Sequence, residues 1–178
     1  MDQSQLKGLI RTVPDFPKSG IQFRDITTLL AHGEGLSASV QALADIASGL
    51  EADAVAGIEA RGFIFGTALA LELGKGFIPL RKAGKLPVET LGEDYALEYG
   101  TARLELDPTL IEEGQRVLVV DDLLATGGTA IAGTRLLRRA GAVVTDALFV
   151  IDLPVLGGKE ALAAEELATH AVVSFEGH

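Results

Sequence analysis

Short, mostly apolar runs recur along this chain, and a stretch with helical periodicity separates most of them from the next. The runs cover residues 54–58, 76–80, 117–120, 143–151 and 171–175. Strands that are apolar throughout, without alternation, belong to a sheet that is covered on both faces. Their alternation with helices predicts parallel strands joined by right-handed crossovers. The predicted fold class is therefore α/β, with a doubly wound, mostly parallel central sheet flanked by helices.

The helices that we predict between and before these strands cover residues 1–12, 34–49, 63–73, 128–140 and 160–167. Pro14 and Pro17 keep the stretch after the first helix extended. Residues 86–106 contain two glycines and end in the alternating sequence ARLEL, which predicts a hairpin or an excursion from the sheet. No repeat or long linker divides the chain, so we expect one domain over residues 1–178, with residues 1–33 as its N-terminal segment.

The most informative segment is Val117–Thr129, in which a buried strand runs into two adjacent carboxylates and then a loop of small residues. Glycines allow backbone N–H groups to close around an anion, and the N-terminus of the following helix adds partial positive charge. A phosphate therefore suits the loop. Its residues are Ala125, Thr126, Gly127, Gly128 and Thr129.

The two carboxylates, Asp121 and Asp122, would repel a free phosphate beside them. They fit a phosphate that is attached to a group rich in hydroxyls, because carboxylates accept hydrogen bonds from a ribose. The segment therefore predicts a cradle for a ribose 5-phosphate. The alternative is a strand that ends in solvated acids, followed by a glycine turn and a capped helix.

Composition excludes several other classes of function. The net charge of −10 disfavours broad contact with nucleic acid, and no 18-residue stretch is free of charge, which argues against a membrane span. The chain has no cysteine, and its three histidines have no metal-ligand spacing. We therefore expect a cytoplasmic protein without a metal site of its own. Against the acidic average, Arg81, Lys82 and Lys85 form one basic island.

The segment 117–129 closely resembles the signature with which type I phosphoribosyltransferases bind 5-phosphoribosyl-1-pyrophosphate (PRPP). Further similar motifs point to the branch of that family that uses adenine as its base. They are PDFPKSGIQFRDIT (14–27), GIEARGFIFG (57–66), IPLRKAGKLP (78–87) and YALEYGTARLEL (95–106). The match runs from about residue 6 to residue 178. It implies transfer of ribose 5-phosphate from PRPP to adenine, with release of pyrophosphate, in a fold that carries an N-terminal base-recognition hood and a flexible flap at 86–106.

On the PRPP side, the resemblance implies that Asp121 and Asp122 hold the ribose hydroxyls and that residues 125–129 hold the 5′-phosphate. It places Arg61 at the pyrophosphate, where residues 81–85 supply further cations. Mg²⁺ is expected to arrive bound to PRPP. Since the family is usually dimeric, we expect a homodimer, with the 81–85 segment acting across its interface.

On the base side, the resemblance implies that Phe23 stacks on adenine while backbone groups of Ile21 and Phe23 read its edge. Arg24 would fix that segment, and Leu124 would close the other face of the base. Glu98, beside Tyr99 in the flap, would share a proton with adenine N7. Glu98, Arg61 and Lys82 are thus the expected catalytic residues.

Simpler interpretations exist for several of these residues. Arg61 could be an ordinary surface arginine, and Phe23 could be a core residue. Residues 81–85 could form a solvated turn, and residues 98–99 could belong to a strand edge. Two other functions share the PRPP signature, namely a phosphoribosyltransferase for another base and a PRPP-sensing regulator without catalysis. The segment 21–24 and the LEYG motif favour adenine, and the acidic charge disfavours a DNA-binding regulator.

Overall fold

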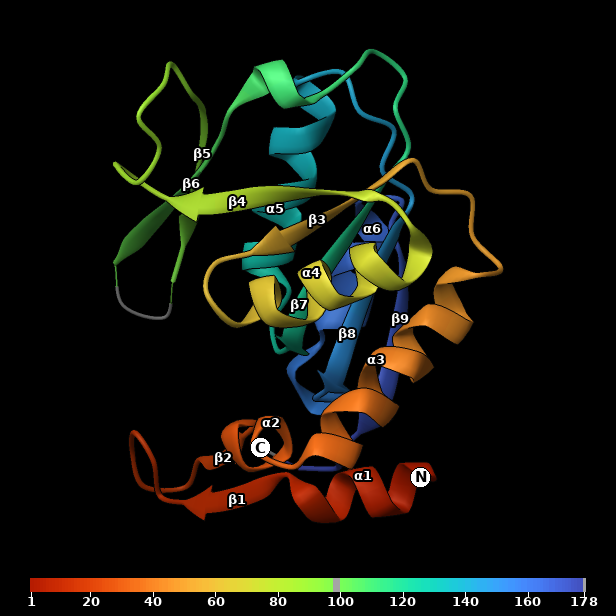
Figure 1. Ribbon diagram of the computed structural model, residues 1–178. Coiled ribbons are helices and arrows are strands. Elements are labelled where there is room, and N and C mark those ends of the chain that lie inside the picture. Colours follow the sequence, from red (N-terminus) through yellow and green to blue (C-terminus); the bar gives the residue numbers. More distant parts are fainter. Residues whose placement is uncertain (98–99, 178) are drawn as a thin grey trace.

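A computed structural model describes residues 1–97 and 100–177 of the chain, and its centre is a twisted sheet (Figure 1). Within the described residues this sheet has seven strands. In their order across the sheet they are β5 (Leu91–Ala96), β6 (Thr101–Leu106), β4 (Gly76–Lys82), β3 (Ala54–Ile58), β7 (Val117–Leu124), β8 (Asp146–Asp152) and β9 (Ala168–Ser174). The five strands from β4 to β9 run parallel, and the β5–β6 hairpin joins β4 antiparallel. The predicted α/β class is confirmed.

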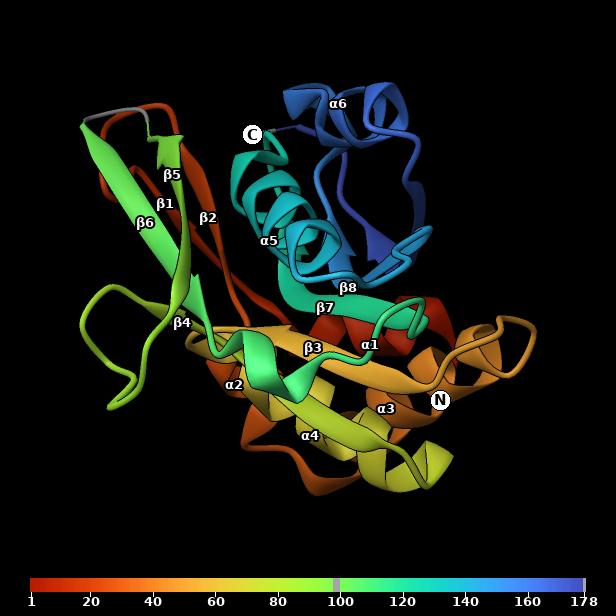
Figure 2. The same cartoon turned by 90° about the horizontal axis from the view of Figure 1, so that it is seen from above.

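Helices cover both faces of the parallel strands, as the apolar runs require (Figure 2). One face packs against α3 (Gly33–Ala47) and α4 (Arg61–Leu73), and the other against α5 (Gly128–Arg139) and α6 (Gly158–Ala164). Every residue of β3 is buried, as are Val117–Val120 of β7. Two separate apolar cores result, one on each side of the sheet.

A small N-terminal unit lies below the main sheet in Figure 1. It comprises α1 (Gln3–Leu9), β1 (Arg11–Pro14), β2 (Gln22–Asp25) and α2 (Thr27–Leu30). Strands β1 and β2 pair antiparallel, with Val13 opposite Phe23. Short 3₁₀ turns at Pro108–Leu110 and Pro154–Leu156 complete the described elements.

Several predicted boundaries are wrong. The first helix ends at Leu9 rather than at residue 12, because Arg11 and Thr12 pair with β2 and Pro14 favours extended backbone before it. Strand β7 continues through Leu124, so the two aspartates lie within the strand and not after it. Helix α6 ends at Ala164, which leaves Ala168 to begin β9. The predicted hairpin in residues 86–106 is confirmed as β5 and β6.

Candidate active site

The acidic pair on β7 marks the end of the sheet where side chains gather. Asp122 is buried, and its Oδ2 accepts a hydrogen bond from Nε of Arg61 at 2.5 Å. Asp121 accepts a hydrogen bond from the backbone N–H of Asp122 at 2.9 Å. Arg61 is the first residue of α4, which follows β3. Two neighbouring strand–helix units are thus joined by one ion pair at their functional ends.

Close packing of α4 against β7 depends on Gly62. A Cβ at this position would lie 2.8 Å from the carbonyl oxygen of Val120 and 2.9 Å from Oδ1 of Asp121. Real Cβ atoms do not approach other atoms so closely, so a side chain here would push the helix off the strand. Glycine therefore brings the first turn of α4, with its partial positive charge, against the acidic pair.

The electrostatics of the pair are asymmetric. Burial and the negative charge of Asp122 raise the pKa of Asp121 well above its ordinary value. Burial alone would lower the pKa of Arg61, but the hydrogen bond and charge of Asp122, with the charges of Asp121 and Asp25, raise it. The cluster therefore holds a permanently charged arginine beside a carboxyl group that resists ionisation.

The loop after β7 forms a small polar hollow. Gly127 has φ of +88° and caps α5, and no side chain provides a capping hydrogen bond there. The first N–H groups of a helix have no partner within the helix, so those of α5 are available to an anion. The hollow has a volume of about 90 Å³, several times the space that one water needs. All five predicted phosphate-loop residues line it.

A larger cavity of about 640 Å³ joins this loop to the rest of the chain. Ile21 from the N-terminal unit lines it on one side, and Ala96 and Leu97 of the hairpin line it on another. Leu156, which follows β8, also reaches it. The structure therefore brings the predicted phosphate loop, the predicted base-recognition segment and the turn end of the β5–β6 hairpin around one space.

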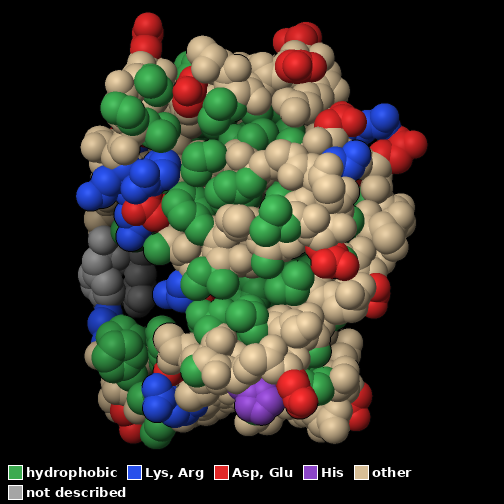
Figure 3. All heavy atoms as spheres, viewed as in Figure 1, with side chains coloured by type: hydrophobic (Ala, Val, Ile, Leu, Met, Phe, Trp, Pro, Cys, Tyr) green, Lys and Arg blue, Asp and Glu red, His purple; other side chains and the backbone are tan. Residues whose placement is uncertain are grey.

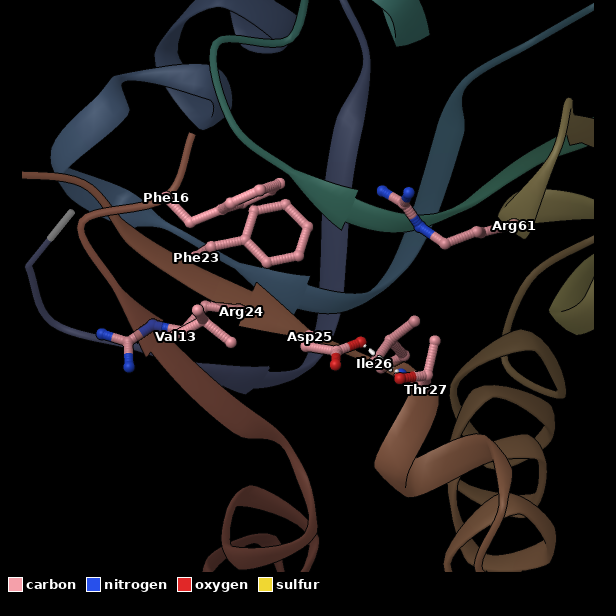
Figure 4. A pocket seen from close by; sticks show the side chains of 8 residues that line it. All are labelled: Val13, Phe16, Phe23, Arg24, Asp25, Ile26, Thr27 and Arg61. Atoms are coloured by element: carbon pink, nitrogen blue, oxygen red, sulfur yellow. Dashed lines mark hydrogen bonds between the residues drawn. The ribbon is translucent and has the colours of Figure 1, made fainter. Parts of the chain in front are cut away.

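A third cavity, of about 430 Å³, lies under the β1–β2 hairpin (Figure 4). Phe16 and Phe23 meet edge to face across 5.2 Å on one side, and Arg61 extends toward them from the opposite side. Phe23 and Arg24 were predicted on the base side and Arg61 at the pyrophosphate, and all three line this cavity. Phe16 and Asp25 also line it but were not predicted, although both lie within the motif 14–27. An apolar wall beside a few charged groups suits a flat, neutral heterocycle.

Asp25 stabilises the floor of this cavity. Hydrogen bonds from Thr27 and from Arg11 lower the pKa of Asp25 to about 2. The hydroxyl and the backbone N–H of Thr27 both donate to the same carboxylate oxygen, at 2.6 and 2.9 Å. Asp25 therefore stays ionised and fixes the turn from β2 into α2.

The basic island lies at the end of β4, beside β3. Glu59 accepts a hydrogen bond from Nε of Arg81 at 3.0 Å and one from the backbone N–H of Lys82 at 2.9 Å. Burial would raise the pKa of Glu59, but these two donors and the positive charges lower it. The sequence analysis did not assign Glu59 a role. Lys82 and Lys85 have exposed side chains, and Figure 3 shows basic groups gathered on the left of this face.

The prediction for Leu124 needs correction. Leu124 is 1% exposed and packs in the core beside α6, where a Cβ at Gly158 would meet its side chain at 2.8 Å. Leu123 is only half-buried and packs against the opposite core, together with Leu156. Leu123 is therefore the better candidate for a contact with the base. Glu98 and Tyr99 lie outside the described residues.

Neither a metal cluster nor a membrane helix is found in the described part of the chain. No three His, Asp or Glu side chains gather there as a metal site would require. None of the helices formed by residues 1–97 and 100–177 is long and apolar enough to cross a membrane.

Comparison with known proteins gives consistent matches. Residues 25–161 match the model of the phosphoribosyl transferase domain family. The adenine phosphoribosyltransferase of Novosphingobium aromaticivorans is 65% identical over 178 residues, which cover all of both chains. The crystal structure of the same enzyme from Thermoanaerobacter pseudethanolicus has a TM-score of 0.92 at 44% identity, covering 97% of this chain and 99% of that one. A Saccharomyces cerevisiae structure, complexed with adenine and an imino-altritol bisphosphate, has a TM-score of 0.85 at 34% identity, covering 96% and 97%.

The two glycines of the loop should respond differently to substitution by alanine. At Gly127 a Cβ would lie 2.6 Å from Leu162 and the backbone is left-handed, so Gly127→Ala should destabilise the fold by about 2 kcal/mol. The side chain would point toward Leu162 and Gly158 of α6. At Gly128 the nearest atom is the carbonyl oxygen of Ala96 at 3.7 Å. Gly128→Ala should therefore keep its stability and lose affinity for phosphate-bearing ligands.

Urea unfolding measures the stability of each variant, and titration with ribose 5-phosphate measures its affinity. Equal stability of the two variants would contradict the prediction.

The raised pKa of Asp121 gives a pH-dependent prediction. Above the ordinary carboxyl value of 3.8 the unfolded chain loses this proton while the folded chain retains it. The folded state then binds more protons, so its stability falls as pH rises toward the folded pKa.

Asp121→Asn removes this loss of stability. The variant should melt at a higher temperature than the parent at pH 7, and the difference should shrink as the pH approaches 3.8. Asp122→Asn, which loses the ion pair with Arg61, should melt lower at pH 7 and serves as the control. A Tm gain for Asp121→Asn that does not vary with pH would contradict the assignment.

Proposed function

We propose roles for the site residues from one premise: this chain belongs to the phosphoribosyltransferase family. It functions as an adenine phosphoribosyltransferase, a pentosyltransferase of purine salvage that converts adenine and PRPP to AMP and pyrophosphate. The structural observation that carries the proposed roles is the single space shared by the loop after β7, Ile21 and the turn end of the β5–β6 hairpin.

We assign ribose 5-phosphate to β7 and the start of α5. Asp121 and Asp122 would accept hydrogen bonds from the ribose hydroxyls, and the loop 125–129 would receive the 5′-phosphate. The free N–H groups at the start of α5 and the helix dipole support this placement. The other lining residues are apolar apart from Asp121, whose raised pKa reduces the negative charge beside the phosphate.

We assign adenine to the space beside the β1–β2 hairpin. Phe23 offers a ring face or edge to the base, and Ile21 offers backbone groups to its polar edge. Leu123 would approach from the sheet. An apolar site of this kind stabilises a neutral ring by removing its surface from water, and the backbone groups supply selectivity for its edge.

We assign pyrophosphate to the cations at the ends of β3 and β4. Arg61 is rigidly held by Asp122, and Arg81 and the backbone of Lys82 are held by Glu59. The side chains of Lys82 and Lys85 are exposed, so they can extend toward a ligand beside these fixed groups. Positioned cations of this kind stabilise charge as it develops on a leaving group.

In the proposed mechanism the bond from the anomeric carbon to pyrophosphate breaks, the ribose ring gains oxocarbenium character, and adenine N9 bonds to that carbon. Adenine gives up its N9 proton as the new bond forms, and the departing pyrophosphate accepts that proton. Glu98, if protonated, would donate to N7 and so orient and activate the base. Closure of the flap would exclude water, which would otherwise hydrolyse PRPP.

Mg²⁺ is proposed to enter with PRPP, where it neutralises part of the pyrophosphate charge. The residues fit this arrangement, because Mg²⁺ keeps most of its water and phosphate ligands and needs few from the protein. Asp122 is already paired with Arg61, which leaves Asp121 as the nearest carboxyl group with no cationic hydrogen-bond partner.

We further propose a cytoplasmic homodimer. The outer side of α4 exposes Ile64 and Leu71, the latter at 77%, and Figure 3 shows hydrophobic side chains spread across the centre of that face. A patch of this kind suits contact with a second copy. The basic island lies beside it, so a partner subunit would meet the island at its edge. The absence of cysteine fits a reducing compartment.

The substrate assignment is tested by offering each free base in turn with PRPP and Mg²⁺. Adenine should be consumed with formation of AMP, while hypoxanthine, guanine, xanthine and orotate should react at least about a hundredfold more slowly, because buried polar groups of the site would lack partners. Turnover of hypoxanthine or guanine faster than that of adenine would assign the chain to another branch of the family. Binding of PRPP without turnover of any base would favour a regulator.

Glu98 gives a prediction that separates catalysis from binding. An ionised carboxylate would repel the lone pair of adenine N7, whereas a protonated one would donate to it. Glu98→Leu should therefore lose about 10²–10⁴-fold in kcat while PRPP affinity changes little. Glu98→Gln should lose less, because an amide still donates one hydrogen bond. Steady-state kinetics with a separate PRPP titration measure the effect, and wild-type kcat for Glu98→Leu would show that the base is activated by another group.

A further inference from the structure

An aromatic ring at the far end of the chain lies beneath the base-recognition hairpin. Phe175 follows the last residue of β9, and the guanidinium carbon of Arg24 lies 4.5 Å from the centre of its ring. The ammonium of Lys7, on α1, lies 5.4 Å from the same centre. Both distances fall within the range of cation–π attraction. Residues about 150 positions apart are therefore joined at this point.

The direction of the Arg24 side chain explains the contact. Phe23, Arg24 and Asp25 of β2 all line the cavity, but the guanidinium of Arg24 extends away from the two phenyl rings (Figure 4). There Nη1 of Arg24 donates to the hydroxyl of Thr12 at 2.5 Å. Its Nε is buried and has no hydrogen-bond acceptor among the described residues. A buried donor without an acceptor is costly, and the face of Phe175 lies 4.5 Å from the guanidinium carbon to which this donor is bonded.

Phe175 itself is fixed by the main domain. Its backbone N–H donates to the carbonyl oxygen of Asp152 at 3.0 Å, which continues the pairing of β9 with β8. Its half-buried ring packs against the core that lies between the sheet and α3 and α4. The ring is thus a fixed point of the sheet, whereas the hairpin that carries Arg24 is a two-stranded unit of its own.

We propose that Phe175 is a positioning residue for adenine: its ring holds Arg24 and thereby fixes the segment Ile21–Phe23 at the base. The inference rests on the proposed assignment of this segment to adenine. Within the described residues, the ring and hydrogen-bond contacts of Phe175 are with Arg24, Lys7 and Asp152, and none of these three is assigned to the proposed PRPP site. Loss of the ring contact should therefore weaken the use of adenine and leave the use of PRPP almost unchanged.

The experiment compares Phe175→Leu with Phe175→Tyr. Leucine keeps an apolar side chain but loses the ring face, and tyrosine keeps the ring. Phe175→Leu should raise KM for adenine about fivefold to thirtyfold, as loss of a desolvated cation–π contact implies, with KM for PRPP within about twofold. Phe175→Tyr should stay near the parent. Phe77→Leu is the matched control, because Phe77 is a half-buried ring that packs on Phe63, away from the hairpin.

The outcomes separate the inference from the assignment on which it depends. A parallel rise in both KM values, matched by Phe77→Leu, would show general loosening and overturn the inference. Phe23→Leu is measured alongside. If it raises KM for adenine while Phe175→Leu does not, the inference falls and the base assignment stands. If neither variant changes it, the base assignment falls as well. Should Phe175→Leu not fold, Arg24→Met removes the same contact from the other side and must show the same selective rise in KM for adenine.

Discussion

The close approach of α4 to β7 is the constraint on which the rest of the site depends. It requires Gly62, because any side chain there would overlap the backbone of Val120 and the carboxylate of Asp121. The approach delivers Arg61 to Asp122, and it encloses Asp121 so that ionisation is disfavoured. The same strand end starts the loop that leads into α5. The proposed ribose, 5′-phosphate and pyrophosphate positions therefore all depend on this one packing contact.

An acidic protein that binds polyanions needs its positive charge in fixed places. The chain carries −10 overall, yet Arg61, Arg81 and the start of α5 meet at the carboxyl ends of β3, β4 and β7. Glu59 and Asp122 hold the two arginines and reduce the freedom that a ligand would otherwise have to restrict. The cost is that each arginine is partly neutralised before a ligand arrives. Backbone N–H groups carry no such cost, which explains why the loop supplies so much of the proposed phosphate contact.

Much of this fold follows from sequence, because wholly apolar strands and glycine-closed helices leave strong local signals. Strand β3 and helix α3 were predicted within one or two residues. The PRPP signature predicted the loop 125–129, which lines the hollow after β7. The predictions failed where contacts with distant parts of the chain determine the local structure. Arg11 and Thr12 continue a helical pattern but pair with β2, and burial of Leu124 beside Gly158 depends on α6, which lies more than 30 residues away. Glu59 and Asp25 gave no signal of their own, since a single acid reveals its role only when its donors are known.

Part of β4 forms an unpaired edge of the sheet, and this edge affects how the protein behaves at high concentration. On β4, strand β6 pairs only with Arg81 and Lys82, so the preceding residues of β4 have β3 on one side and no strand of the described residues on the other. Such an edge is a template on which foreign strands can assemble into aggregates. Pro79 lies in the middle of that stretch and offers no N–H to an arriving strand. A proline in the edge strand thus guards the molecule against self-association through its sheet, close to the cations that must remain accessible.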